Sequence, residues 1–402
     1  MSVVQTAPLL KVPVSSSVEL RFLDGLRGLA ALEVMVGHAR WLLWEGYSTG
    51  YLKHPDTYSI LGKVLVYFFS AFRYGHQAVM FFFVLSGFVI HLRYAQKIQK
   101  DGHDAKFDFW TFIKRRAKRL YPPLILAMVI TLLCDALGVF RNYAIYFHAT
   151  PYELMNQNIT MDHRLVTAIG NLLFLMKTYV PTWGTNDPLW SLKFEWWFYM
   201  LYPLFFLITK RSVLLATLLM TVLFVLSFFD SIWPLLLLRS VFSAMLFWWF
   251  GALLADIYTG RIPISFKFLC PLVGALFLLP FFPGGTVLND LVWSIFFVGV
   301  ISVCFVIQDL KARVLTPLIK LKWLGDMSYS LYVIHFPILI LMSGWLMSRS
   351  PDHSLPSVFG YLFAGMFIVM ASAYLAHLAV ERPFISRGRE AVVRTQKEPV
   401  AT

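Results

Sequence analysis

Residues 23–44 read LDGLRGLAALEVMVGHARWLLW, a run of apolar and small side chains interrupted by a few ionisable ones. A helix of this length rises about 1.5 Å per residue and crosses a hydrocarbon core about 30 Å thick. Comparable runs recur along the 402 residues, and they predict ten spans: 23–44, 77–95, 121–140, 189–209, 212–229, 234–257, 266–282, 287–308, 325–347 and 357–380. A backbone in lipid must satisfy its own hydrogen bonds, and helical runs of this length do so. The sequence therefore predicts an all-α, polytopic transmembrane bundle of about ten helices.

The composition indicates the same environment. Hydrophobic residues make up 58% of the chain and charged residues only 14%, a balance that a water-soluble domain of this size could not cover with polar surface. The first twenty residues are polar and lack the apolar core of a removable signal peptide. We expect a multi-pass protein of the cell's inner (plasma) membrane, with a transmembrane domain at 23–382 between a cytoplasmic segment 1–22 and a basic cytoplasmic tail 383–402.

The formal net charge of +13 could indicate nucleic-acid binding or membrane topology. Lysine and arginine are concentrated in alternate connections between the predicted spans, and the positive-inside rule then places both termini in the cytoplasm. Topology accounts for most of the charge, so we expect no nucleic-acid partner. Cys134, Cys270 and Cys304 lie in or beside apolar runs without CxxC spacing, and we expect neither a metal site nor a disulfide framework.

Ionisable residues in the first span are candidate catalytic residues. Arg27 and His38 are eleven residues apart, about three turns, which places them on one helix face about 16 Å apart along the axis. Asp24 precedes Arg27 by three residues and can pair with its guanidinium. His38 can act as a general base, because a neutral imidazole accepts a hydroxyl proton near neutral pH. The alternative is a structural hydrogen bond between helices.

Glu195, at the outer end of predicted span 189–209, is the third candidate catalytic residue. A carboxylate at this depth needs a partner. It can orient His38 or bind a sugar hydroxyl, or it can simply pair with Lys193 or Arg40. In the second span, Gly87 permits a close helix contact and Ser86 can hydrogen-bond across it, which favours a packing role for this pair.

A cluster of cations precedes the third span. Residues 114–119 read KRRAKR, five cations in six residues. Arg116 and Arg119, three apart, share a helix face and present guanidinium groups suited to phosphate oxygens. Together with Arg115 they are candidate residues for binding a phosphate-containing substrate that donates a group, called the donor below. The alternative is an ordinary positive-inside stop or contact with anionic lipid headgroups.

Polar residues also mark one face of predicted span 325–347. Tyr329, Tyr332 and His335 follow one another at intervals of three, near the inner side, where they can line the path of a donor. Tyr329 and His335 are therefore also candidate donor-binding residues.

Two long outer connections, 45–76 and 141–188, mix aromatic and polar residues. Loops of this length usually have a function. Here they form either a surface that binds the substrate accepting the group, called the acceptor below, or a loop that only covers the bundle. Aromatic faces and planar polar groups hold sugars, so the candidate acceptor-binding residues are Trp183, Asn186, Asp187 and Trp190. A stretch at 165–176 is expected to form an amphipathic or re-entrant helix.

In this order, the motifs resemble acyltransferase family 3, the multi-spanning membrane O-acyltransferases. The resemblance covers about Arg21 to Pro383. It rests on RFLDGLRGLAAL with Arg27 and His38, FVLSGFVI at 83–90, the RxxR pair Arg116 and Arg119, WSLKFEWWFY at 190–199 and SYSLYVIHFP at 328–337.

The resemblance implies transfer of an acyl group, commonly acetyl, from cytoplasmic acetyl-coenzyme A to a hydroxyl of a carbohydrate or glycoconjugate. Acetyl-coenzyme A would be a co-substrate, with no permanently bound cofactor. The implied partners are acyl-coenzyme A, the acceptor, the lipid bilayer and other proteins of polysaccharide biosynthesis. From the residues alone, the alternative is a multi-spanning transporter that uses intramembrane Arg, His and Glu.

Overall fold

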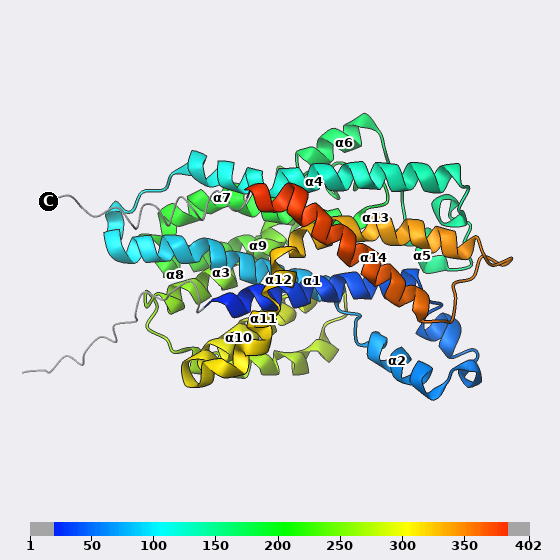
Figure 1. The fold of residues 1–402 in the computed structure, drawn as a ribbon. Helices are drawn as coiled ribbons and strands as arrows, with labels where there is room; N and C mark the ends of the chain where they lie inside the picture. Colours follow the sequence, from blue (N-terminus) through cyan, green and yellow to red (C-terminus); the bar gives the residue numbers. More distant parts are fainter. Residues whose placement is uncertain (1–19, 385–402) are drawn as a thin grey trace, which may run out of the picture.

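The structure is a computed structural model that describes residues 20–384, and within this range it is built from helices without strands, as the sequence predicts. Most of the expected N-terminal segment and basic tail lies outside these residues. The α-helices are α1 (Arg21–Leu42), α2 (Ile60–Ser70), α3 (Gly75–Asp101), α4 (Phe109–Phe140), α5 (Glu153–Asn158), α6 (Leu165–Leu172), α7 (Leu192–Thr209), α8 (Val213–Leu226), α9 (Leu236–Tyr258), α10 (Val287–Lys311), α11 (Thr316–Lys320), α12 (Lys322–Asp326), α13 (Ser328–Met347) and α14 (Gly360–Ala376). The long helices run along one bundle, which α14 crosses obliquely (Figure 1).

Helical structure overlaps each of the ten predicted spans. In the described range, six segments are long and apolar enough to cross a membrane: Gly75–Asp104, Phe109–Phe140, Leu236–Tyr258, Val287–Lys311, Ser328–Met347 and Gly360–Phe384. The chain is thus a multi-pass membrane protein by length and composition of its helices. Helices α1, α7 and α8 are not among these six. Ionisable side chains lower the hydropathy of α1 and α7, and α8 has only 14 residues. The count of ten spans stays a prediction.

Two predicted spans differ in detail from their helices. Residues Cys270–Phe281 form a 3₁₀ helix instead of an α-helix, with Pro271 in its first turn and Pro280 near its end. Pro280 cannot donate the N–H of a helix interior, whereas Pro271 stands in the first turn, where proline is tolerated. The basic run 114–119 is not a separate connection, because it forms part of the first turns of α4 and continues directly into the apolar part of that helix.

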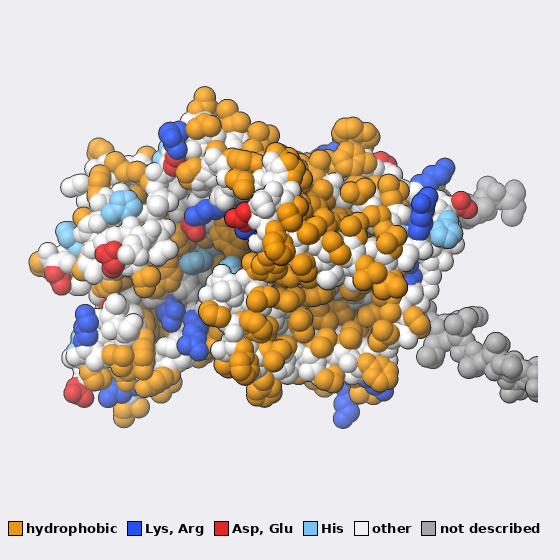
Figure 2. Space-filling model, turned by 180° about the vertical axis from the view of Figure 1, so that it is seen from behind, with side chains coloured by type: hydrophobic (Ala, Val, Ile, Leu, Met, Phe, Trp, Pro, Cys, Tyr) orange, Lys and Arg blue, Asp and Glu red, His pale blue; other side chains and the backbone are white. Residues whose placement is uncertain are grey.

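Hydrophobic side chains form a broad band on the face seen in Figure 2, and charged side chains gather toward the two ends. A hollow beside this band contains histidine and charged side chains. Helix α4 exposes Ile125, Val129, Leu132, Leu133 and Leu137, as expected of a helix that faces lipid. In Figure 1, α1 begins and α14 ends toward the same end of the bundle, where α3 also ends. Which side of the membrane this end faces stays a prediction.

Close backbone contacts hold α1 in the middle of the bundle, against α3, α12 and α13. A Cβ atom on Gly25 would lie 2.0 Å from the carbonyl oxygen of Leu318, and one on Gly325 would lie 1.9 Å from the carbonyl oxygen of Asp24. Only residues without a Cβ permit this approach. The glycines of α1 therefore set the distance between its ionisable face and the neighbouring helices.

A second close contact joins α3 and α9. A Cβ atom on Gly87 would lie 1.8 Å from the carbonyl oxygen of Trp248, and one on Gly251 would lie 1.8 Å from that of Val84. The indole N–H of Trp248 donates to Ser86 Oγ at 3.3 Å. The predicted packing role of Gly87 and Ser86 is confirmed.

We predict that Gly87→Ala destabilises the protein, because the added methyl group must displace the backbone of α9. Overpacking of this kind typically costs about 1–3 kcal/mol. Thermal unfolding of the purified protein in detergent measures the loss. Gly274→Ala is the matched control, since its Cβ would have no neighbour nearer than 4.0 Å; equal unfolding temperatures for the two variants would contradict the interpretation.

Candidate active site

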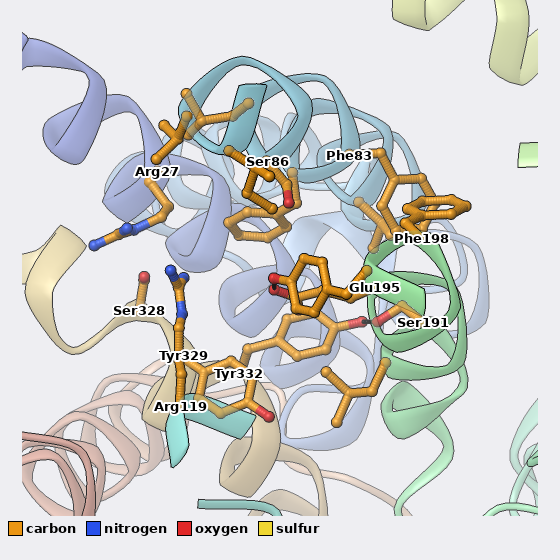
Figure 3. A pocket seen from close by; sticks show the side chains of 17 residues that line it. Arg27, Phe83, Ser86, Arg119, Ser191, Glu195, Phe198, Ser328, Tyr329 and Tyr332 are labelled. Atoms are coloured by element: carbon orange, nitrogen blue, oxygen red, sulfur yellow. Dashed lines mark hydrogen bonds between the residues drawn. The ribbon is translucent and has the colours of Figure 1, made fainter. Parts of the chain in front are cut away.

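A pocket between α1, α3, α4, α7 and α13 brings together four of the residues that the sequence analysis selected, Arg27, Arg119, Glu195 and Tyr329 (Figure 3). Among the described residues, its charged lining consists of two arginines and one glutamate: Arg27, Arg119 and Glu195. Hydroxyl groups complete its polar wall, from Ser86, Ser191, Tyr199, Ser328, Tyr329 and Tyr332. The lining thus places two guanidinium groups, which can bind an anion, beside one carboxylate.

Arg27 is fixed at the pocket edge by α12. Its Nε and Nη2 donate to the carbonyl oxygen of Gly325 at 3.2 and 2.6 Å. Asp24 lies 3.5 Å from Nη2, so the ion pair predicted from their spacing is confirmed. Gly28 makes this geometry possible, because a Cβ there would lie 2.7 Å from the backbone nitrogen of Gly325.

Arg119 enters the same corner of the pocket from α4, beside Ser328 (Figure 3). Its guanidinium makes no ion pair or hydrogen bond with the residues that the structure describes, and its Nε is buried without a partner. One turn earlier, the Arg116 guanidinium lies 5.3 Å from the ring centres of both Phe112 and Tyr199. Arg115 is exposed and does not line the pocket. Of the three arginines selected as donor-binding, the structure brings only Arg119 into the pocket itself.

Glu195 faces the interior of the pocket (Figure 3). Its carboxylate accepts a hydrogen bond from Tyr199, one turn further along α7, and it forms no ion pair with a described residue. Lys193 points elsewhere, to the hydroxyls of Thr178 at 2.9 Å and Ser240 at 3.0 Å. The Lys193 and His38 contacts considered for Glu195 are therefore not made, and its carboxylate stays available to the contents of the pocket.

Tyr329 and Tyr332 line the pocket from α13. The Tyr329 hydroxyl donates to the carbonyl oxygen of Leu120 at 3.1 Å. Tyr332 donates to the carbonyl oxygen of Pro188 at 3.0 Å, and its oxygen lies 2.7 Å from the Ser191 hydroxyl. Tyr332 thus ties α13 to the start of α7 and forms one wall of the pocket.

His38 meets His335 rather than Glu195. The His38 Nδ1 and His335 Nε2 atoms are 2.9 Å apart, and the His38 ring also packs on Phe336 at 4.8 Å between centres. His335 is fully buried, whereas His38 keeps part of its surface accessible. The candidate base is therefore paired with a residue that the sequence analysis assigned to the donor.

Neither histidine lines the pocket that contains Arg27. The connection is Tyr332, which lines the pocket and whose ring centre lies 6.1 Å from that of His335. Since α1 is a regular helix, Arg27 and His38 stay about 16 Å apart along its axis. The histidine pair thus lies outside the charged pocket, with the Tyr332 ring between His335 and the pocket.

Two of the four candidate acceptor-binding residues are buried and make hydrogen bonds within the protein. Trp183 is buried, and its indole donates to the carbonyl oxygen of Met128 at 2.9 Å. Asn186 is buried and donates to the carbonyl oxygen of Val333 at 2.8 Å. Pro337, four residues later, cannot donate to that carbonyl. Asn186 therefore replaces the missing helical hydrogen bond and supports α13 beside His335.

The other two candidates stay accessible. Asp187 forms an ion pair with Lys177 at 2.6 Å and keeps 37% of its side chain exposed. Trp190 is half-buried and stacks on His76, with 5.4 Å between ring centres and 16° between planes. His76 in turn contacts Asp290 at 3.0 Å. Asp187 and Trp190 stay predicted acceptor-binding residues.

Among the contacts that hold the long connection 141–188 to α4 is a buried carboxylate that accepts three hydrogen bonds. Asp135 is 1% exposed and accepts from the Thr185 backbone N–H at 3.0 Å, the Thr185 hydroxyl at 2.7 Å and His163 at 2.9 Å. The stretch expected to be amphipathic contains helix α6, which exposes Leu165, Val166 and Ile169.

The sequence analysis did not assign Gly325, Ser328 or Ser191 to the site. Gly325 acts through its backbone carbonyl, which side-chain chemistry cannot reveal. Ser191 and Ser328 lie within the quoted motifs at 190–199 and 328–337, next to Trp190 and Tyr329. Their place in those motifs is the sequence feature that could have assigned them to the site.

Comparison with known proteins agrees with this arrangement of motifs. The profile of the family described as an acyltransferase domain, Acyl_transf_3, matches residues 20–377. The chain belongs to acyltransferase family 3. This membership favours an acyltransferase over a transporter.

The chain is also similar to the peptidoglycan O-acetyltransferase OatA of Listeria monocytogenes. The two are 21% identical over 357 residues, which cover 82% of this chain and 51% of the relative. The chain therefore spans about half the length of this curated relative. No solved structure matches the chain.

We predict that Asp135→Ala loosens the connection 141–188, because the Thr185 and His163 donors lose their acceptor. A buried donor left unsatisfied typically costs about 1–3 kcal/mol. Limited proteolysis should cleave this connection faster than in the wild type. Asp56→Ala, at an exposed position of the connection 45–76, is the control; the same cleavage rate in both variants would contradict the anchoring role of Asp135.

Proposed function

We propose that this protein transfers an acyl group, acetyl in the simplest case, from acyl-coenzyme A to a hydroxyl of a carbohydrate or glycoconjugate. Family membership supports acyl transfer. The observation that carries the finer proposal is the pocket in which Arg27 and the unpaired Arg119 converge, one ring away from the His38–His335 pair. An anionic donor held in this pocket would thus lie next to a base.

Arg119 is the residue we assign to the donor's phosphate groups, with Arg116 one turn away. An unpaired guanidinium inside a membrane domain is costly, and a phosphate oxygen would supply the missing partner through charge-assisted hydrogen bonds. Arg27 lies too far along α1 from His38 to contact an oxyanion formed beside the imidazole. We therefore assign Arg27 to the donor as well.

The reaction proceeds by attack of the acceptor hydroxyl on the thioester carbonyl. His38 takes the hydroxyl proton on Nε2, the new C–O bond forms, and the C–S bond breaks with release of coenzyme A as thiolate. His38 then donates this proton to the thiolate sulfur. The pantetheine arm reaches this point from Arg119 along Glu195 and Tyr332, and Glu195 can accept a hydrogen bond from the arm or from the acceptor.

We place the acceptor at the opposite end of the bundle from the basic start of α4. Positive-inside topology assigns that start, and both termini, to the cytoplasm, so the acceptor enters from outside the inner membrane beside Asp187 and Trp190. The similarity to a peptidoglycan O-acetyltransferase supports a cell-surface polysaccharide as acceptor class. Other proteins of polysaccharide biosynthesis would then be its partners.

We predict that Arg119→Ala weakens binding of coenzyme A about 10- to 100-fold, the size expected for lost hydrogen bonds to a charged group. The residual binding should also depend less on salt concentration. Isothermal titration calorimetry at two ionic strengths measures both effects. Lys118→Ala, an exposed neighbour on α4, is the control; unchanged binding in Arg119→Ala would instead favour contact with lipid headgroups.

We predict that His38→Ala leaves coenzyme A binding intact and lowers acyl transfer by about 10² to 10⁴, the usual contribution of a general base. Incubation with radiolabelled acetyl-coenzyme A and a glycan extract, followed by measurement of alkali-labile label, tests this. His103→Ala, at an exposed position between α3 and α4, is the control. Full activity of His38→Ala at equal abundance would remove His38 from its role.

A further inference from the structure

We infer that His335 is the positioning residue that holds His38 in the tautomer a general base requires. The inference rests on the proposed function, and it changes the role of His335 from donor binding to control of the base. It is argued from the hydrogen bonds of the two rings.

The partners of His335 determine where its proton lies. Its Nδ1 is 2.8 Å from the carbonyl oxygen of Tyr332 and 3.1 Å from that of Leu331. Carbonyl oxygens only accept hydrogen bonds, so Nδ1 must carry the hydrogen. In a neutral imidazole the other nitrogen is then an acceptor, and Nε2 of His335 offers a lone pair.

That lone pair determines the state of His38. Its Nδ1 lies 2.9 Å from Nε2 of His335, so this Nδ1 must donate. Neutral His38 then carries its lone pair on Nε2, opposite the nitrogen that meets His335; the ring also makes a hydrogen bond with the backbone of Val34, one turn earlier in α1. The side chain is also partly accessible. The nitrogen able to take a proton from an acceptor hydroxyl is thus Nε2, opposite His335.

A neutral partner suits this location. No carboxylate among the described residues hydrogen-bonds to either ring. A buried anion in a membrane domain is costly, whereas the His335 imidazole orients His38 without adding charge. When His38 becomes an imidazolium, its Nδ1–H still donates to His335. A proton passed on to Nε2 of His335 would leave a fully buried imidazolium whose other N–H meets only carbonyl oxygens, so a relay would end there. The proton taken from the acceptor hydroxyl therefore goes from His38 Nε2 to the leaving thiolate.

The surroundings keep His335 in place. Asn186 satisfies the Val333 carbonyl that Pro337 leaves free, and Tyr332 is tied to Pro188 at 3.0 Å. The His335 ring is fully buried in this frame. Its orientation is therefore set by α13, and the tautomer of His38 follows from it.

The test compares His335→Gln with His335→Leu. The glutamine carbonyl can accept from His38 Nδ1, whereas leucine removes the acceptor. We expect His335→Leu to lower kcat about 10- to 100-fold with KM for acetyl-coenzyme A within about twofold of the wild type. His335→Gln should recover at least about a third of the wild-type kcat, as a positioning role requires. His103→Gln is the exposed control for the same substitution.

A second measurement separates positioning from general damage. With ¹⁵N-labelled histidine, and His38→Gln to assign the signal, nitrogen NMR reports which ring nitrogen of His38 carries the hydrogen. We expect hydrogen on Nδ1 in the wild type and in His335→Gln, and a shift of population toward Nε2 in His335→Leu. Hydrogen on Nε2 in the wild type, or equal loss of activity in both variants with unchanged NMR spectra, would overturn the inference.

The NMR result also stands apart from the proposed function. If the wild type bound no coenzyme A and transferred no acyl group, the proposed function would fail, while the tautomer of His38 would still be measured. If transfer occurred but His335→Leu kept full kcat, the proposed function would survive and the role of His335 would fail.

Discussion

Ionisable groups placed inside a membrane-embedded bundle are the constraint on which the rest of the structure depends. Each guanidinium, imidazole or carboxylate there must find a partner or face a cavity, because lipid offers none. Arg27 has the Gly325 carbonyl and Asp24, and His38 has His335. Arg119 has no such partner in the described residues. An ionisable group without a partner among the described residues, such as Arg119, therefore indicates where a substrate binds.

Close packing makes this arrangement possible. Gly25, Gly28 and Gly325 bring α1 and the segment before α13 to backbone contact, and only at that distance can Arg27 reach the Gly325 carbonyl. On the other side, Gly87 and Gly251 bring α3 and α9 together. The site is thus held by rigid helix contacts on both sides, which favours a preorganised pocket over one formed by loops.

The charged pocket and the histidine pair meet at Tyr332. This residue lines the pocket, is tied to the start of α7 through Ser191 and Pro188, and lies next to His335. In the proposed reaction, the donor extends from Arg119 toward His38 beside this ring. In the proposed reaction, Tyr332 is therefore the residue at which the donor site meets the site of proton transfer.

The sequence alone determined the class of fold, because long apolar runs in lipid can satisfy their backbones only as helices. It also determined the motifs, the pairing of Asp24 with Arg27 and the packing role of Gly87, since all of these follow from local spacing. Only the tertiary structure decided the long-range partners. It placed His335 rather than Glu195 on His38, buried Trp183 and Asn186 and left Arg115 outside the pocket. Helical periodicity specifies the direction in which a side chain leaves its own helix, whereas its partner depends on how helices far apart in the chain pack together.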